Sequence, residues 1–129
     1  MSVSNDHCIL WIEGGVIYCI YKGTPMDVEG AKSVVNLRKS IQNGVSLPGI
    51  IDIRNMTKVT KEARAYFASP EACELVTKVA ILIDSNLSMV LGNIYLKINK
   101  PPILSKLFTT LQEAREWALS PAKDTTLKT

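Results

Sequence analysis

The stretch Gly49–Phe67 constrains the fold of this chain more than any other. It begins with the apolar run Ile50-Ile51-Asp52-Ile53, passes through a polar turn with hydroxyl side chains, and continues as a helical pattern over residues 61–67. A short strand rich in β-branched residues, a turn and a helix form the unit from which open α/β sheets are built. In such sheets the loops at the carboxyl ends of the strands usually bind ligands and partners. The pattern therefore predicts an α/β domain with a working edge directly after this strand.

The size and composition are those of a single globular domain. With 129 residues, of which 47% are hydrophobic and 21% charged, the chain is long enough to bury a sizeable core. The net charge of +3 is mild and the basic residues are scattered among acids, so we expect no nucleic-acid partner. No apolar run approaches the ~20 residues of a membrane span, and the first residues lack the blocks of a signal peptide. A cytoplasmic protein is expected.

The three cysteines indicate neither a metal site nor a disulfide framework. Cys8, Cys19 and Cys73 lie within apolar runs and form no CxxC pair or Cys/His cluster. Their residue type and surroundings predict buried thiols in a reducing compartment. We therefore expect no metal and no cofactor.

The apolar periodicity changes along the chain between strand-like and helical. Gly14-Gly15 separates two strand-like runs and predicts a hairpin. Thr24-Pro25 predicts a helix N-cap followed by proline, with Asp27 at capping-box spacing, and Asn43-Gly44 predicts the end of that helix. The remaining predicted elements are a strand at 50–53, a helix after residue 60 that restarts or kinks at Pro70, a strand at 79–83, a helix at 86–99, a strand at 104–108 and a helix from 110 to 117.

The order β-β-α-β-α-β-α-β-α predicts one mixed, mostly parallel sheet with an N-terminal hairpin and helices packed on it. We place this single α/β domain at residues 1–119 and expect a frayed polar tail at 120–129. The helix at 86–99 is expected to bury one continuous apolar stripe, formed by Leu87, Val90, Leu91, Ile94 and Ile98. Gly92 costs this helix roughly 1 kcal/mol against alanine, which favours close packing against a neighbour.

Several short motifs occur in a fixed order along the chain. They are Ile51-Asp52-Ile53-Arg54, Thr60-Lys61-Glu62-Ala63-Arg64, Phe67, the run from Val79 to Ser85, Asn99-Lys100-Pro101-Pro102, Leu107-Phe108 and the run from Glu113 to Trp117. With the order of elements given above, the chain resembles the STAS domain of bacterial anti-sigma-factor antagonists and sulfate-transporter tails. More narrowly, these motifs make it similar to a set of uncharacterised bacterial STAS-like proteins. The resemblance implies a non-enzymatic regulatory module that acts through contact with another protein.

The phosphorylation switch of the antagonist proteins does not carry over to this sequence. The resemblance implies a phosphorylated serine at the start of the helix after the Asp-bearing strand, and this position falls on Lys61, with Thr60 where an acidic residue normally stands. Thr60 is the nearest hydroxyl, and its position predicts a helix N-cap. Whether Thr57 or Thr60 is phosphorylated stays open.

Two helix N-termini and several cations are predicted at the carboxyl ends of the parallel strands. If they share one crevice, backbone N–H groups and basic side chains there suit a phosphate or carboxylate. The alternative is that the hydroxyls cap the helices and the cations lie on a solvated turn. The candidate ligand or partner surface comprises Arg54, Thr57, Lys58, Thr60, Lys61, Asp84, Ser85 and Asn86.

No catalytic arrangement stands out in the sequence. The only histidine, His7, lies in an N-terminal segment that we expect to be mobile, where a nucleophilic triad would not be held in place. Asp52 and Asp84 can form a carboxylate pair, or Asp52 bonds local backbone N–H groups while Asp84 helps to cap the next helix. A hydrolase that uses a cysteine or an aspartate is the third and weakest hypothesis.

The aromatic residues of the hairpin and of the helix at 86–99 allow two interpretations. Trp11, Tyr18, Tyr21 and Tyr95 supply either a partner surface or the core of a small domain, with core favoured for Trp11 and Trp117. An exposed edge of the hairpin is a natural route to a homodimer. The favoured function is a STAS-like protein-interaction module. The alternative is binding of a small anionic or lipid-like ligand in the crevice at the carboxyl ends of the strands.

Overall fold

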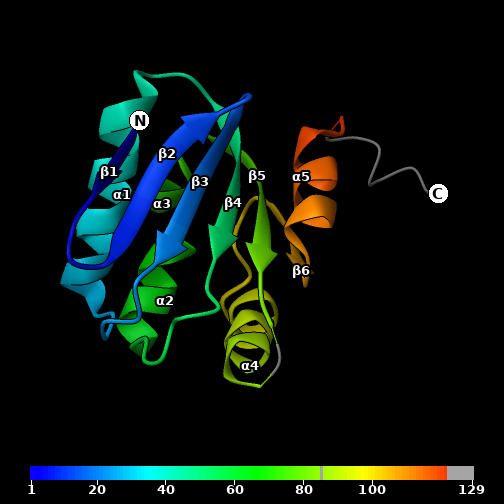
Figure 1. Cartoon of the computed structure of the whole chain (residues 1–129). Coiled ribbons are helices and arrows are strands. Elements are labelled where there is room, and N and C mark those ends of the chain that lie inside the picture. The colour runs from blue at the N-terminus through cyan, green and yellow to red at the C-terminus, as the bar shows by residue number, and fades with distance from the viewer. Residues whose placement is uncertain (85, 122–129) are drawn as a thin grey trace.

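One sheet of six strands runs through the molecule, and its order β1-β2-β3-β4-β5-β6 follows the sequence (Figure 1). The structure is a computed structural model and describes residues 1–84 and 86–121. The strands are β1 (Ser2–Ser4), β2 (Cys8–Glu13), β3 (Val16–Tyr21), β4 (Leu47–Asp52), β5 (Val76–Leu82) and β6 (Leu104–Phe108). The first three strands are antiparallel, and β3 to β6 are parallel. The predicted mixed, mostly parallel α/β sheet is confirmed.

The helices cover both faces of the sheet. They are α1 (Val28–Gln42), α2 (Lys61–Phe67), α3 (Pro70–Cys73), α4 (Leu87–Ile94), the π-helical turn η1 (Tyr95–Asn99) and α5 (Leu111–Leu119). Parallel strands that follow one another in the sheet have crossovers of one hand, so α1 to η1 gather on one face. Only α5, which follows the last strand, packs on the opposite face (Figure 1). No helix within residues 1–84 and 86–121 is long and apolar enough to cross a membrane.

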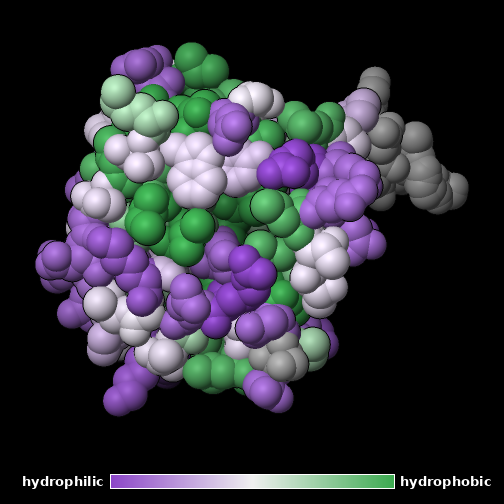
Figure 2. Space-filling view, in the orientation of Figure 1, coloured by the Kyte–Doolittle hydropathy of each residue, from purple (hydrophilic) through white to green (hydrophobic). Residues whose placement is uncertain are grey.

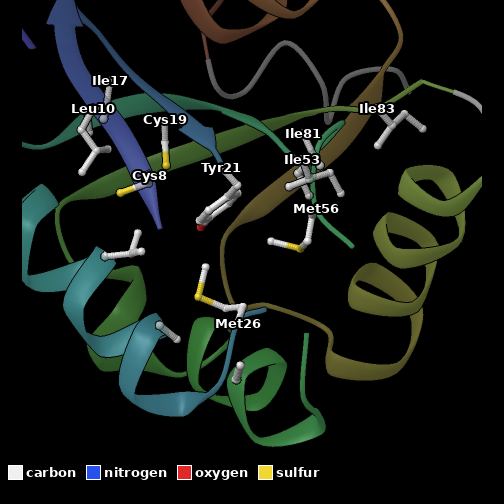
Figure 3. Packing of buried hydrophobic residues seen from close by; sticks show 13 residues of the cluster. Cys8, Leu10, Ile17, Cys19, Tyr21, Met26, Ile53, Met56, Ile81 and Ile83 are labelled. Atoms are coloured by element: carbon white, nitrogen blue, oxygen red, sulfur yellow. The ribbon is translucent and has the colours of Figure 1, made fainter. Parts of the chain in front are cut away.

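Alternate side chains of β3 enter two separate apolar clusters. Ile17 and Cys19 point into the larger cluster, between the sheet and α1 to η1 (Figure 3). Val16 and Tyr18 point the other way and pack with Ala114 of α5. Because successive residues of a strand face opposite sides, a strand covered on both faces is buried almost throughout. This explains the unbroken apolar sequence of β3.

The hairpin forms as predicted, but the segment before it is not mobile. Gly14 and Gly15 both have positive φ, 58° and 79°, as a tight hairpin requires. Upstream, β1 pairs with β2 in the register Ser4↔Ile9, and His7 Nδ1 lies 2.9 Å from Thr24 Oγ1. The expectation of a loose N-terminus is wrong because its backbone pairs with the outer edge of β2. That edge is therefore covered, and β1 is the terminal strand on this side.

Helix α1 begins three residues later than expected. Its N-cap is Asp27, whose side chain accepts from Gly30 N at 2.8 Å. The Thr24 hydroxyl instead donates to Asp6 O, and Met26 is extended because it forms a β-bridge with Val59. The chain is thus held in an extended conformation across Pro25, so the helix cannot start there. The predicted helix end is confirmed, since Asn43 adopts the left-handed conformation.

The stripe predicted for α4 and η1 is wrong in part. Leu87, Val90 and Ile98 are 46%, 53% and 70% exposed, whereas Ser88 and Gly92 are buried. The close packing expected at Gly92 is confirmed, because a Cβ there would lie 2.9 Å from Leu107 Cδ2. Because Ser88 and Gly92 are small and lie one turn apart, the helix can approach the sheet closely on this side. The side of the helix that carries part of the apolar stripe is therefore exposed to solvent.

Candidate functional site

The predicted site residues follow the carboxyl ends of β4 and β5. We call Arg54, Lys58, Lys61, Asp84 and Asn86 the carboxyl edge. All five are exposed, and the segments that carry them follow the ends to which the arrows of β4 and β5 point (Figure 1). Ser85, which was also predicted to belong to the site, lies outside the described residues. Residues 122–129 of the predicted tail are likewise outside them.

A carboxylate and a guanidinium form the best-defined contact of the carboxyl edge. Asp52 is buried, and its Oδ1 accepts from Arg54 N and from Arg54 Nε, both at 3.0 Å. Its Oδ2 accepts from Arg54 Nη2 at 2.8 Å. This hydrogen bonding raises the pKa of Arg54 from its ordinary value, and the charges of Asp52 and then Asp84 add to the increase. The prediction that Asp52 bonds a local backbone N–H is confirmed.

The loop from β4 to α2 is fixed against the loop that precedes α1. Thr57 Oγ1 donates to Gly23 O at 3.1 Å, and Lys58 O accepts from Met26 N at 2.9 Å. A Cβ on Gly23 would lie 2.8 Å from Asn55 O, so the two loops touch. At the end of this loop Thr60 Oγ1 accepts from Ala63 N at 3.0 Å, which confirms Thr60 as the N-cap of α2.

The turn from β5 to α4 is held by a different pair of side chains. Asp84 Oδ1 accepts from Ser88 Oγ at 2.5 Å, and Ser88 Oγ accepts from Asp84 N at 2.9 Å. Asn86 is the N-cap residue of α4, with φ 63°, but its side chain makes no capping hydrogen bond. Asp84 therefore secures the first turn of α4 through a side chain rather than through a helix amide.

The structure brings together only part of the predicted site. The negative charges of Asp52 and Asp84 both interact with Arg54. Among the described residues, no hydrogen bond or ion pair links Lys58 or Lys61 to the β5–α4 turn. Helix α2 starts beside the loop before α1, whereas α4 starts beyond the end of β5 (Figure 1). The shared anion crevice stays a prediction.

Two cavities lie on opposite faces of the sheet. One has a volume of about 120 Å³ and lies between β2, β3 and the start of α5. Its lining includes Arg54, the stacked rings of Trp11 and Tyr18, and Arg115, whose Nε donates to the Tyr18 hydroxyl at 3.0 Å. This face carries apolar and aromatic surface among polar groups (Figure 2). Trp11 and Trp117, expected in the core, are half-buried and pack against the α5 cluster.

The second cavity was not anticipated from the sequence. We call it the inner cavity; its volume is about 140 Å³, and it lies between the sheet and the helices of the larger cluster. The charged residues in its lining are Arg38 and Arg64, together with the hydroxyl-bearing Tyr21 and Tyr95. The sequence signal was weak: an arginine within the apolar face of α1, at Arg38, between Val35 and Ile41.

The titratable side chains that line the inner cavity are thiols, tyrosines and arginines. Within residues 1–84 and 86–121 no three His, Cys, Asp or Glu side chains cluster in a way that could hold a metal ion. Cys8, Cys19 and Cys73 are buried free thiols, as predicted. A hydrogen bond with Cys8 and burial both raise the pKa of the Cys19 thiol, which keeps it protonated near neutral pH.

Comparison with known proteins gives a fold and a family. The chain is similar to an uncharacterised protein of the DUF3478 family from Shewanella loihica PV-4, whose crystal structure has a SpoIIAA-like fold. The two share 17% identity with a TM-score of 0.62, over 90% of this chain and 98% of the other. The fold is therefore SpoIIAA-like, which confirms the STAS-like architecture. No curated protein sequence matches the chain. A family model covers residues 10–121, and the chain belongs to that family, the domain of unknown function DUF7793.

Proposed function

We propose that this protein is a non-enzymatic interaction module that binds a protein partner through the carboxyl edge and the outer side of α4. The SpoIIAA-like fold supports the general class, since the STAS domains that the sequence resembles include regulatory modules. The observation that carries the proposal is the exposed apolar surface on α4.

The outer side of α4 has the composition of a docking surface rather than of a solvated helix. Leu87 and Val90 are about half exposed, and the helix has no acidic residue in its first turn and no basic residue in its last. Contiguous exposed apolar patches mark interaction sites, whereas singly exposed apolar residues are common, and on α4 three near neighbours, Leu87, Met89 and Val90, are exposed together. Lys58 and Lys61 on α2 and its preceding loop add charge without an ion pair to any described residue. Together they suit a partner with apolar side chains and acidic residues.

The local chemistry at this end of the molecule is also consistent with binding rather than turnover. The Asp52 carboxylate is engaged by Arg54, and the Asp84 carboxylate by Ser88. Both aspartates thus hold the chain in place at the ends of β4 and β5. His7 is likewise engaged through Nδ1 with Thr24.

The experiment compares tagged wild type with two surface variants in affinity capture from native lysate. We expect Lys58→Glu combined with Lys61→Glu, and separately Val90→Asp, to lose a specific partner that wild type retains. Matched controls are Lys106→Glu and Leu104→Asp, at exposed positions of β6 away from the surface. If every specific partner stays bound to both edge variants, this surface is not the interface. Circular dichroism of each variant shows that the fold is kept.

A further inference from the structure

The inner cavity is mostly walled by carbon. Its walls come from β3, β4 and β5 below and from α1, α2, α3 and η1 above. Figure 3 shows Tyr21, Ile53 and Met56 pointing into this layer between the sheet and the helices. Its volume of about 140 Å³ is close to that of an engineered apolar cavity that accepts benzene. The space is therefore large enough for a small organic molecule.

Among the described residues, the charges in this apolar wall are positive. Arg38 and Arg64 line the inner cavity, and no aspartate or glutamate of residues 1–84 and 86–121 does. Arg38 is 6% exposed, and its Nη1 and Nη2 donate to Glu74 O and Ala72 O, both at 3.1 Å. Carbonyl dipoles rather than a carboxylate thus face this guanidinium. Burial lowers the pKa of Arg38 from its ordinary value, although nearby tyrosine and cysteine groups act in the opposite direction.

Arg64 has a buried donor without an acceptor. Its Nη1 donates to Val59 O at 3.3 Å, but Nε is buried and has no hydrogen-bond partner among the described residues. Leaving a charged donor buried and unpaired is costly, and native proteins rarely do so without a reason. An acceptor brought by a ligand would remove this cost.

We propose that the inner cavity binds a small amphipathic monocarboxylate, with the carboxylate at Arg64, Arg38 as a second positive charge in the wall, and a compact apolar body of about six carbons, the size of a benzene ring, in the remaining space. Carboxylates form charge-assisted hydrogen bonds with guanidinium groups, so the polar end and the apolar end of such a ligand each match part of the wall. This site is independent of the function proposed above, because its lining includes none of Arg54, Lys58, Lys61, Leu87 and Val90.

Methyl NMR of the full chain tests the site with sodium benzoate as the probe, because its ring is the size of benzene. We expect benzoate to shift the methyl signals of Ile51, Ile53 and Ile81, which line the cavity, and to leave Ile98, which is 70% exposed, unchanged. Benzyl alcohol has the same ring without the charge and should bind at least tenfold more weakly. No shift with millimolar benzoate, or shifts centred on Ile98 and Val90, would overturn the proposal.

The role of the guanidinium is tested with Arg64→Gln and a matched control, Arg115→Gln, which changes an arginine outside the inner cavity. Arg64→Gln should weaken benzoate binding at least tenfold and leave benzyl alcohol binding unchanged, whereas Arg115→Gln should change neither. Arg64 is preferred to Arg38 because the latter also bonds the carbonyls at the end of α3. Equal affinity of wild type and Arg64→Gln for benzoate would overturn the carboxylate assignment. Thermal melting of the variants verifies that they are folded.

Discussion

Lys78 occupies a buried position of β5, where an apolar residue would be expected. It is 2% exposed, and its Nζ lies 3.0 Å from both Ser120 O and Ser120 Oγ, just beyond the end of α5. The ammonium also lies 4.4 Å from the centre of the Trp117 ring, within range of a cation–π interaction. One buried side chain thus fastens the end of α5 to the sheet.

Replacing this lysine should therefore cost much more stability than replacing its neighbour on the strand. We expect Lys78→Ala to lower the free energy of unfolding by about 3 kcal/mol, since it leaves a cavity and unpaired groups. Thr77→Ala, at an exposed position, should change it by less than about 0.5 kcal/mol. Urea unfolding followed by Trp fluorescence measures both. Equal losses would show that Lys78 does not hold α5.

Single residues could be predicted from the sequence where their partners are local. Thr60 caps α2 through Ala63, and Asp52 bonds the amide of Arg54, both within three positions. Thr24 was assigned to the wrong role because its hydroxyl bonds Asp6, which is 18 positions away. A capping rule based on sequence spacing considers only hydrogen-bond partners within a few residues. It therefore cannot account for a partner that the fold brings close from a distant part of the chain.

At the scale of elements, α4 shows how a periodic pattern can be correct and its buried face still be misjudged. The apolar spacing of Leu87, Val90 and Leu91 predicts a helix, and a helix forms. Which side faces the sheet depends on the close approach at Ser88 and Gly92. Hydrophobicity alone predicts that the larger apolar side chains of α4 face the sheet, whereas the short distance between α4 and the sheet requires the small side chains there.

On α4, a substitution at the small buried Gly92 should therefore destabilise the protein more than a substitution at the apolar but exposed Val90. We expect Gly92→Val to lower the free energy of unfolding by about 2 kcal/mol, because the added methyl groups press against Leu107 and Ile83. Val90→Asp removes an apolar side chain that is 53% exposed and should cost less than about 1 kcal/mol. Chemical denaturation compares the two. A larger loss for Val90→Asp would mean that α4 buries the stripe first expected.

At the scale of the whole molecule, the two apolar clusters make β3 and β4 central and keep several titratable groups out of water. Tyr21 is 6% exposed in the larger cluster, and burial raises the pKa of its hydroxyl well above the ordinary 10.0. The unfolded chain ionises this hydroxyl at its ordinary pKa while the folded chain still keeps the proton. Folding is therefore favoured fully below about pH 10 and progressively less above it.

Stability should accordingly fall in alkaline solution. We expect the free energy of unfolding to decline above pH 10, with a slope of up to about 1.4 kcal/mol per pH unit from Tyr21 alone. Tyr21→Phe should remove this contribution to the slope while leaving the decline from other buried groups. Urea midpoints measured from pH 8 to pH 11 decide the matter; an identical slope in wild type and Tyr21→Phe would contradict the assignment.

The sequence by itself determined the α/β class, the mostly parallel sheet, the hairpin at Gly14-Gly15 and the caps at Thr60 and Asn43, because these depend on spacing within a few residues. Only the tertiary structure decided that β1 joins the sheet, that α4 turns Leu87 outward and that Arg38 and Arg64 both line one cavity. These features arise between segments far apart in the chain. Their energies depend on which surfaces touch, and a linear pattern does not contain that information.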